Sequence, residues 1–264
     1  MGIIRTDDWM NESFYNVQFI EEKILDTVQS REQFLINSLY KNGLYRPNLK
    51  TKSTFNQMKE GKLWEKLNIY YKKYKRLWKG PDVPVFLFPI GTESFRIFRK
   101  ENKKKSGIAF LDKLFLFVSG DTSDRELEAL FVHEYHHTAR LAKISENMSY
   151  TLGNTIVMEG LAEMAVEEYC GRDYLAPWIA ERNPEDLQKL LKDKFDSKFN
   201  VKRSEKLHDQ LLFGYRSIPK MAGYAVGYKL VKDYANDNDC KTIDLIDLSA
   251  DEILKQHISK DKKS

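Results

Sequence analysis

The stretch FVHEYHHTAR, residues 131–140, carries three of the five histidines in this chain. On an α-helix, residues four positions apart lie on one face a single turn apart, so His133 and His137 can direct their imidazoles at one point. Glu134 follows the first of them, which completes the spacing HExxH, in which two histidines bind Zn²⁺ and the glutamate handles protons. His136 falls outside this spacing, and we expect it to pack beside the site or to hydrogen-bond nearby, without binding metal.

The segments around this stretch predict a mostly helical α+β fold. Apolar residues at three- and four-residue steps predict helices over about 8–40 and 54–78. The apolar, aromatic runs at 83–90 and 106–120 predict strands, the second being one longer strand or two joined at Asp112-Lys113. Helical spacing then returns, over about residues 123–142, 154–169, 184–193, 204–213, 220–236 and 248–258. A small antiparallel or mixed sheet should therefore precede the HExxH helix.

Composition and charge narrow the class of protein. The 264 residues include 43 Lys and Arg against 39 Asp and Glu, a net charge of +4 that does not indicate nucleic-acid binding. We expect the basic runs YYKKYKR (70–76) and KENKKK (100–105) to be solvated. No apolar run approaches the ~20 residues that span a bilayer, and the N-terminal stretch lacks the pattern of a secretory signal. Cys170 and Cys240 form no CxxC pair, so we expect reduced thiols and a cytoplasmic protein. From the charge and the apolar pattern, we expect that it binds neither nucleic acid nor membranes.

A catalytic zinc ion usually takes three protein ligands and a water molecule, so a third ligand is needed. One zincin pattern continues HExxHxxGxxH, but its glycine and third histidine are replaced here by Arg140 and Lys143. The other pattern places a glutamate on a following helix. The stretch NTIVMEGLAEMAVEEY (154–169) offers two candidates one turn apart, Glu159 and Glu163.

We assign Glu159 as the third metal ligand. A carboxylate on a largely apolar helix is costly to bury unless it is paired or bound to a metal. Glu163 is predicted to accept a hydrogen bond from a ligand histidine and so fix its tautomer. Gly160 and Ala162 are small, and we expect them to let this helix approach the HExxH helix closely. Glu167 and Glu168 are expected to face solvent.

The two glutamate-bearing motifs carry a resemblance to known enzymes. HEYHH followed by MEGLAEMAVEEY resembles the HExxH…E arrangement of the gluzincin metallopeptidases. More narrowly, the chain resembles a bacterial family of predicted Zn-dependent proteases with an HExxH helix, an EGLAE-like helix and a downstream GYxxGY. The third motif is present as IPKMAGYAVGYKLV (218–231), and the resemblance covers about residues 83–235. It implies a zincin-like domain over residues 81–264 on which a helical region of residues 1–80 packs, or one continuous domain.

The resemblance also implies a reaction. One Zn²⁺ per chain, held by His133, His137 and Glu159, would lower the pKa of a water molecule toward ~7. Glu134 would act as the general base in peptide-bond hydrolysis and return the proton to the leaving amine. A group beside the metal must stabilise the oxyanion, and similar enzymes use a tyrosine or histidine.

Two tyrosines and one strand complete the expected site. Tyr224 and Tyr228 share a helix face, and either could stabilise the oxyanion; we favour Tyr224. In similar peptidases the sheet edge beside the metal binds the substrate backbone, and Gly107 and Ala109 would leave room for a peptide or protein substrate. The alternatives are a catalytically inactive or regulatory zinc-binding protein with the same fold, and a zinc hydrolase that acts on something other than peptides.

Overall fold

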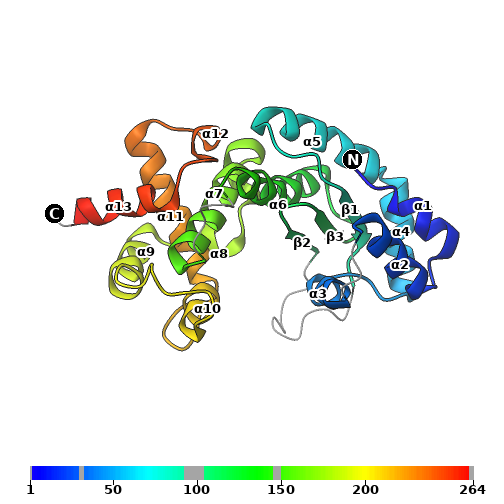
Figure 1. The fold of residues 1–264 in the computed structure, drawn as a ribbon, viewed down its shortest axis with the longest axis horizontal. Coiled ribbons are helices and arrows are strands. Elements are labelled where there is room, and N and C mark those ends of the chain that lie inside the picture. Colours follow the sequence, from blue (N-terminus) through cyan, green and yellow to red (C-terminus); the bar gives the residue numbers. More distant parts are fainter. Residues whose placement is uncertain (1, 30–32, 92–103, 145–149, 262–264) are drawn as a thin grey trace. The chain divides into compact units, whose positions relative to one another are not determined.

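The computed structural model describes residues 2–29, 33–91, 104–144 and 150–261. These residues are mostly helical with one small mixed sheet, which confirms the predicted α+β class (Figure 1). The chain divides into two compact units, residues 1–138 and 139–264. The domain boundary near residue 80 stays a prediction. In the described part of the chain, none of the helices has the length and apolar character needed to cross a membrane.

The first unit holds five helices before the sheet, followed by the long HExxH helix. Its elements are α1 (Thr6–Ser13), α2 (Val17–Thr27), α3 (Gln33–Asn42), α4 (Leu49–Glu60), α5 (Leu63–Trp78), β1 (Val85–Pro89), β2 (Lys105–Ala109), β3 (Leu114–Val118) and most of α6 (Asp124–Ile144). The last residues of α6 belong to the second unit. The second alternative for residues 106–120, two strands joined at Asp112-Lys113, is confirmed.

The two long N-terminal helices predicted from apolar spacing are wrong in their extent. The first is interrupted before α2, where the Asn16 side chain accepts a hydrogen bond from the Phe19 amide and starts a new helix. It is interrupted again after α2, which ends at Thr27, and Gln29 then has a φ of 51°. The second is interrupted at Lys62, whose φ of 53° lies in the left-handed region. Apolar spacing continued across these breaks, which contain no proline, so the pattern alone did not reveal them.

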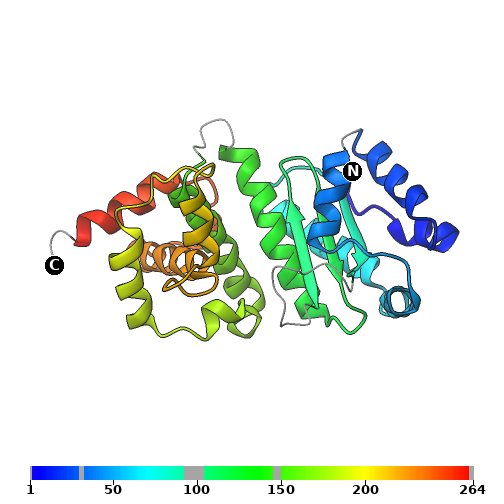
Figure 2. The ribbon, with the colours of Figure 1, turned by 90° about the horizontal axis from the view of Figure 1, so that it is seen from below.

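The sheet has the order β1-β3-β2. β1 runs parallel to β3, and both are buried along their whole length, as expected of strands covered on both faces. β2 runs antiparallel to β3 at the edge of the sheet and is half-buried throughout. Figure 2 shows α6 running alongside the strands, and the Thr138 hydroxyl donates to the Phe110 carbonyl just after β2.

Aromatic packing holds α6 against α5. The rings of Phe131 and Tyr135 stack with centroids 5.1 Å apart, and Tyr135 stacks in turn on Trp78 at 6.1 Å. The Tyr135 hydroxyl donates to the Pro81 carbonyl. One turn earlier on α6, the buried carboxylate of Glu128 accepts hydrogen bonds from Lys73 and Tyr74. The helix that carries HExxH is therefore fixed in the first unit by both apolar and polar contacts.

Part of each basic run is neutralised locally. In residues 70–76, Lys73 pairs with Glu128 and Lys75 with Asp82. In residues 100–105, Lys104 pairs with Asp121, and residues 100–103 lie outside the described residues. The expectation that these runs bind no nucleic acid stays a prediction.

The second unit is helical. Its elements are α7 (Leu152–Cys170), a 3-10 turn (Arg172–Tyr174), α8 (Pro177–Ala180), α9 (Pro184–Leu190), a π-helical turn (Leu191–Phe195), α10 (Lys206–Phe213), α11 (Ala222–Asn238), α12 (Thr242–Leu245) and α13 (Ala250–Asp261). Thr151 begins α7 by accepting a hydrogen bond from the Asn154 amide. The five helices predicted after residue 150 each have a counterpart, whereas the short helices α8 and α12 were not predicted.

Helices α7 and α11 cross at two glycines, one from each of the downstream motifs. A Cβ on Gly160 would lie 2.2 Å from the Gly227 carbonyl oxygen, and a Cβ on Gly227 would lie 1.8 Å from the Ile156 carbonyl oxygen. The two backbones are therefore in direct contact, which no larger residue permits. Gly160 was predicted to allow an approach to the HExxH helix, but the space beside it is occupied by α11.

We expect Gly227→Ala to destabilise the second unit by about 1–3 kcal/mol or more, because the added methyl group meets backbone that cannot rotate away. Urea unfolding followed by circular dichroism measures the loss. Gly61→Ala is the matched control, since its φ of −70° suits alanine and its nearest backbone oxygen lies 3.3 Å from the added Cβ. Equal stability of the two variants would contradict the crossing.

Arg140 stands where the HExxHxxGxxH pattern has glycine. Its buried side chain donates hydrogen bonds to backbone carbonyls within the second unit. Its side chain is 1% exposed, and Nη1 donates to the carbonyls of Leu245 and Ile246. Nη2 donates to the Leu248 carbonyl. Burial lowers the pKa of Arg140 to about 10, so the guanidinium remains charged at neutral pH. The arginine thus supplies hydrogen-bond donors to carbonyls at the end of α12.

Candidate metal centre

The two histidines of HExxH face each other on α6. Their Nε2 atoms lie 3.1 Å apart, and their rings are perpendicular with centroids 4.8 Å apart. Two ligand nitrogens that each lie about 2.0–2.1 Å from a tetrahedral ion would be about 3.3 Å apart, so the pair fits a zinc ion. His133 is half-buried and His137 is 8% exposed, which limits competition from water.

A carboxylate completes the group of candidate ligands. One ligand atom from each of His133, His137 and Glu159 lies within 4.8 Å of the others, and Glu159 is half-buried on α7. Two histidines and one glutamate form a known catalytic zinc set that leaves a coordination position for water. The cluster of the three residues predicted as ligands could therefore hold one metal ion.

Glu134 lies against the edge strand β2. A Cβ on Gly107 would come within 2.5–2.6 Å of Cγ, Cδ and Oε1 of Glu134. The glutamate side chain therefore occupies the space that a larger residue at position 107 would take. Gly107 and Ala109 both lie on β2, where Gly107 pairs with Leu116 and Ala109 with Leu114 of β3. Glu134, the residue predicted to handle protons, and the strand predicted to bind substrate are thus neighbours within the first unit.

Glu163 is buried one turn after Glu159 on α7. Its Oε2 accepts a hydrogen bond of 3.1 Å from the amide of Ala176, directly before α8. This carboxylate therefore connects α7, the helix that carries the candidate ligand Glu159, to the start of α8. The predicted hydrogen bond from a ligand histidine to Glu163 stays a prediction.

Tyr228 takes part in a polar network that the sequence did not indicate. Its hydroxyl donates to Glu167 Oε2 at 2.6 Å, and Lys232 pairs with the same oxygen at 2.7 Å. Burial, followed by the hydrogen bond to Glu167, raises the pKa of Tyr228 well above its usual value, so the phenol stays protonated. The expectation that Glu167 faces solvent is wrong, because its side chain is only 18% exposed and its charge is paired. The sequence did offer one sign that Glu167 is not exposed, because Glu159, Glu163 and Glu167 share one face of α7.

Tyr224 lies one turn before Tyr228 in a different environment. It is half-buried, and its ring contacts those of Trp178 and Phe213 with centroids 6.1 and 6.3 Å away. His136 is fully buried on α6 and packs edge-on against Trp78 at 5.2 Å. This contact agrees with the expectation that His136 packs beside the HExxH pair.

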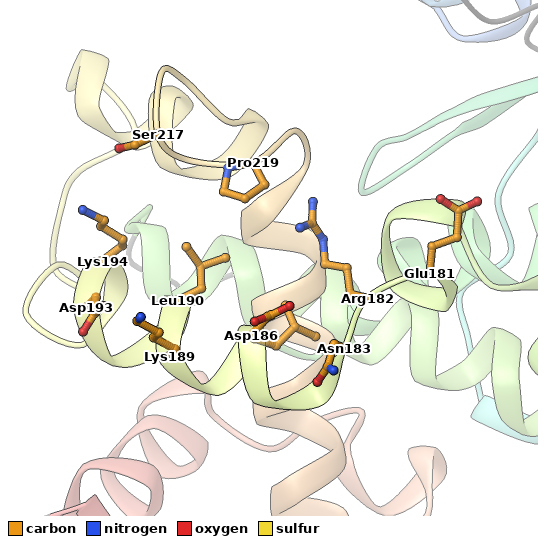
Figure 3. Close-up of a pocket in the computed structure, with 11 residues that line it drawn as sticks. Glu181, Arg182, Asn183, Asp186, Lys189, Leu190, Asp193, Lys194, Ser217 and Pro219 are labelled. Atoms are coloured by element: carbon orange, nitrogen blue, oxygen red, sulfur yellow. The ribbon is translucent and has the colours of Figure 1, made fainter.

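A surface pocket of about 410 Å³ lies elsewhere in the second unit (Figure 3). It is lined by residues of the α8–α9 region, the π-helical turn and the loop before α11, among them Arg182, Asp186, Lys189 and Asp193. Its lining mixes both signs of charge on largely exposed side chains, and none of the predicted site residues contributes to it.

Comparison with known proteins identifies the family. The sequence profile of the family described as "Predicted Zn-dependent protease (DUF2268)" matches residues 63–255. The chain belongs to this family. The Bacillus subtilis (strain 168) protein named "Uncharacterized protein YjaZ" is 38% identical over 221 residues, which make up 83% of this chain and 84% of that protein. "Uncharacterized protein YjfC" of the same organism is 29% identical over 140 residues, 49% of this chain and 46% of its own length. No solved structure matches significantly.

Membership of the Predicted Zn-dependent protease family agrees with the resemblance drawn from the three motifs. The matched range includes all three, from the HExxH helix through α7 to α11. It begins inside the N-terminal region, at the start of α5, whose aromatic residues pack on α6. The relatives named above carry no assigned activity, so the chemistry of this chain is inferred from its own residues.

Proposed function

We propose that this member of the family is a zinc-dependent peptidase. The observation that carries the proposal is the cluster of His133, His137 and Glu159, with Glu134 adjacent in the motif. Zinc, when bound, lowers the pKa of a water molecule to about 7 and polarises a carbonyl. The donor set, two imidazoles and a carboxylate, suits zinc and leaves a position open for that chemistry.

Glu134 then moves the proton. Its carboxylate takes a proton from the attacking water as the water oxygen bonds to the peptide carbonyl carbon. The same carboxylate returns the proton to the amine nitrogen as the carbon–nitrogen bond breaks. Glu134 follows His133 directly on α6, and the backbone of β2 leaves room for it at Gly107.

Tyr224 is the better candidate to stabilise the oxyanion. A donor for this role must present its hydroxyl to the substrate oxygen. The Tyr228 hydroxyl already donates to Glu167, which commits it to the contact between α11 and α7. We therefore propose that Tyr228 orients α11 against α7 and that Tyr224 contacts the substrate.

The substrate backbone is proposed to pair with β2. This strand lies at the edge of the sheet order β1-β3-β2, and its residues Lys105–Ala109 are half-buried. An extended peptide added to such an edge gains main-chain hydrogen bonds without any side-chain requirement. Gly107, opposite Leu116, would bring that peptide close to Glu134.

Metal removal tests the proposal. The purified protein should contain about one zinc per chain by mass spectrometry of its elements, and a diverse peptide library should be cleaved. We expect dialysis against a chelator to abolish cleavage and added Zn²⁺ to restore it. Bound zinc without cleavage would favour the regulatory alternative, and cleavage that persists without metal would contradict the proposal.

Gly107→Ala should lower kcat on the order of 10²-fold, because the new methyl group displaces Glu134 from its position and small displacements of a catalytic group are costly. Zinc content should not change. Ser106→Ala, on the neighbouring position of β2, is the matched control and should keep its activity. An unaltered kcat for Gly107→Ala would show that Glu134 does not need the space beside this glycine.

A further inference from the structure

We propose that Trp178, Phe213 and Tyr224, on segments that contact the turn of α7 carrying the candidate ligand Glu159, form a binding site for an apolar side chain of the peptide substrate. The inference rests on the proposed peptidase function and adds a substrate preference to it. The three rings come from α8, from the end of α10 and from α11, all within the second unit.

The rings contact one another yet remain partly open to solvent. Tyr224 lies at the centre, with Trp178 at 6.1 Å and 70° on one side and Phe213 at 6.3 Å and 39° on the other. Phe213 is 40% exposed, and the other two are half-buried. Partly exposed aromatic rings in mutual contact offer an apolar surface that is already ordered before a ligand arrives.

One hydrogen bond ties this group to the ligand-bearing turn of α7. Glu163, one turn after Glu159, accepts from the Ala176 amide, and Trp178 follows two residues later on α8. Pro177 at the first position of α8 restricts the backbone between them. The position of Trp178 is therefore fixed by the hydrogen bond to Glu163, which lies on the same face of α7 as the candidate ligand Glu159.

A second, independent contact ties Tyr224 to the same turn. Gly227 meets the backbone of α7 at Ile156, and Gly160, next to Glu159, meets Gly227 in return. Tyr224 lies one helical turn before Gly227 on α11. Glycine packing thus holds the central ring near the part of α7 that carries the ligand, whatever the state of the metal.

The chemistry of the group points to an apolar occupant. The three rings carry no charge and present electron-rich faces, so burying a carboxylate side chain among them would cost its hydration without an ionic partner from the rings. A phenylalanine or leucine side chain would instead gain contact with ring faces and edges. Peptides with such a residue next to the cleaved bond should therefore be preferred.

The test uses the full-length, zinc-loaded protein and two peptides that differ only in one residue next to the cleavage point, phenylalanine or aspartate. Phe213→Ala should reduce the preference for phenylalanine in kcat/KM on the order of tenfold. The matched control is Tyr215→Ala, an aromatic residue of the following loop that is 47% exposed. This control should leave the preference unchanged.

A binding arm separates this inference from the proposed function. Fluorescein-labelled versions of both peptides are titrated against the zinc-loaded Glu134→Gln protein, and polarisation reports the dissociation constants. Tighter binding of the phenylalanine peptide that is lost with Phe213→Ala supports the aromatic site even if the wild-type protein cleaves nothing. Cleavage without an apolar preference, or a preference that survives Phe213→Ala, overturns the aromatic site and leaves the peptidase proposal standing.

Discussion

Replacing Glu134 with glutamine is expected to lower kcat by about 10²- to 10⁴-fold, the range associated with loss of a general base. Glutamine keeps the size and the hydrogen-bonding shape of glutamate but cannot accept the proton from water. The two histidines of the motif and Glu159 are unaltered by the change, so zinc should be retained. Peptide cleavage and zinc content, measured on the same preparation, are the two readouts.

The comparison of these two readouts makes the Glu134→Gln experiment decisive. Activity that falls while zinc stays at about one per chain supports the role of Glu134 in moving protons. If zinc is lost as well, Glu134 contributes to the metal site, and the effect on activity has another cause. If activity is unchanged, another group takes the proton and the proposed mechanism is wrong.

His137→Ala and His136→Ala should have opposite effects on zinc binding. The first removes one of two nitrogens that lie 3.1 Å apart, and we expect a loss of zinc affinity larger than the ~10–100-fold known for groups that only support a ligand. The second removes a fully buried ring that packs on Trp78, and it should keep the zinc. Competition with a chromophoric zinc chelator measures both affinities.

His136→Ala should instead reduce stability. Removing a ring that is 0% exposed leaves a cavity, and buried large-to-small changes lower the unfolding free energy by roughly 2–5 kcal/mol. Thermal unfolding of the zinc-loaded variant gives this loss directly. A His136→Ala protein that folds but binds no zinc would reverse our assignment of the two histidines.

Much of the candidate site could be predicted because its motifs are local. His133 and His137 converge through the period of one helix, and the same period aligns Glu159 with Glu163 on another. The strands were recognisable because β1 and β3 are buried runs of apolar residues. Helix ends were harder to predict, since a side-chain cap at Asn16 and a left-handed residue at Lys62 interrupt an apolar pattern that continues past them.

The sequence by itself determined the HExxH pair, the two glutamates that follow it and the α+β class. The tertiary structure decided which residues those motifs contact. Gly160 packs on Gly227, and Glu167 accepts a hydrogen bond from the Tyr228 hydroxyl. The Trp178 ring contacts the Tyr224 ring. The physical reason is the range of the interactions. Spacing along one helix follows from its backbone geometry, whereas contacts between helices depend on how closely and at what angle their backbones pack.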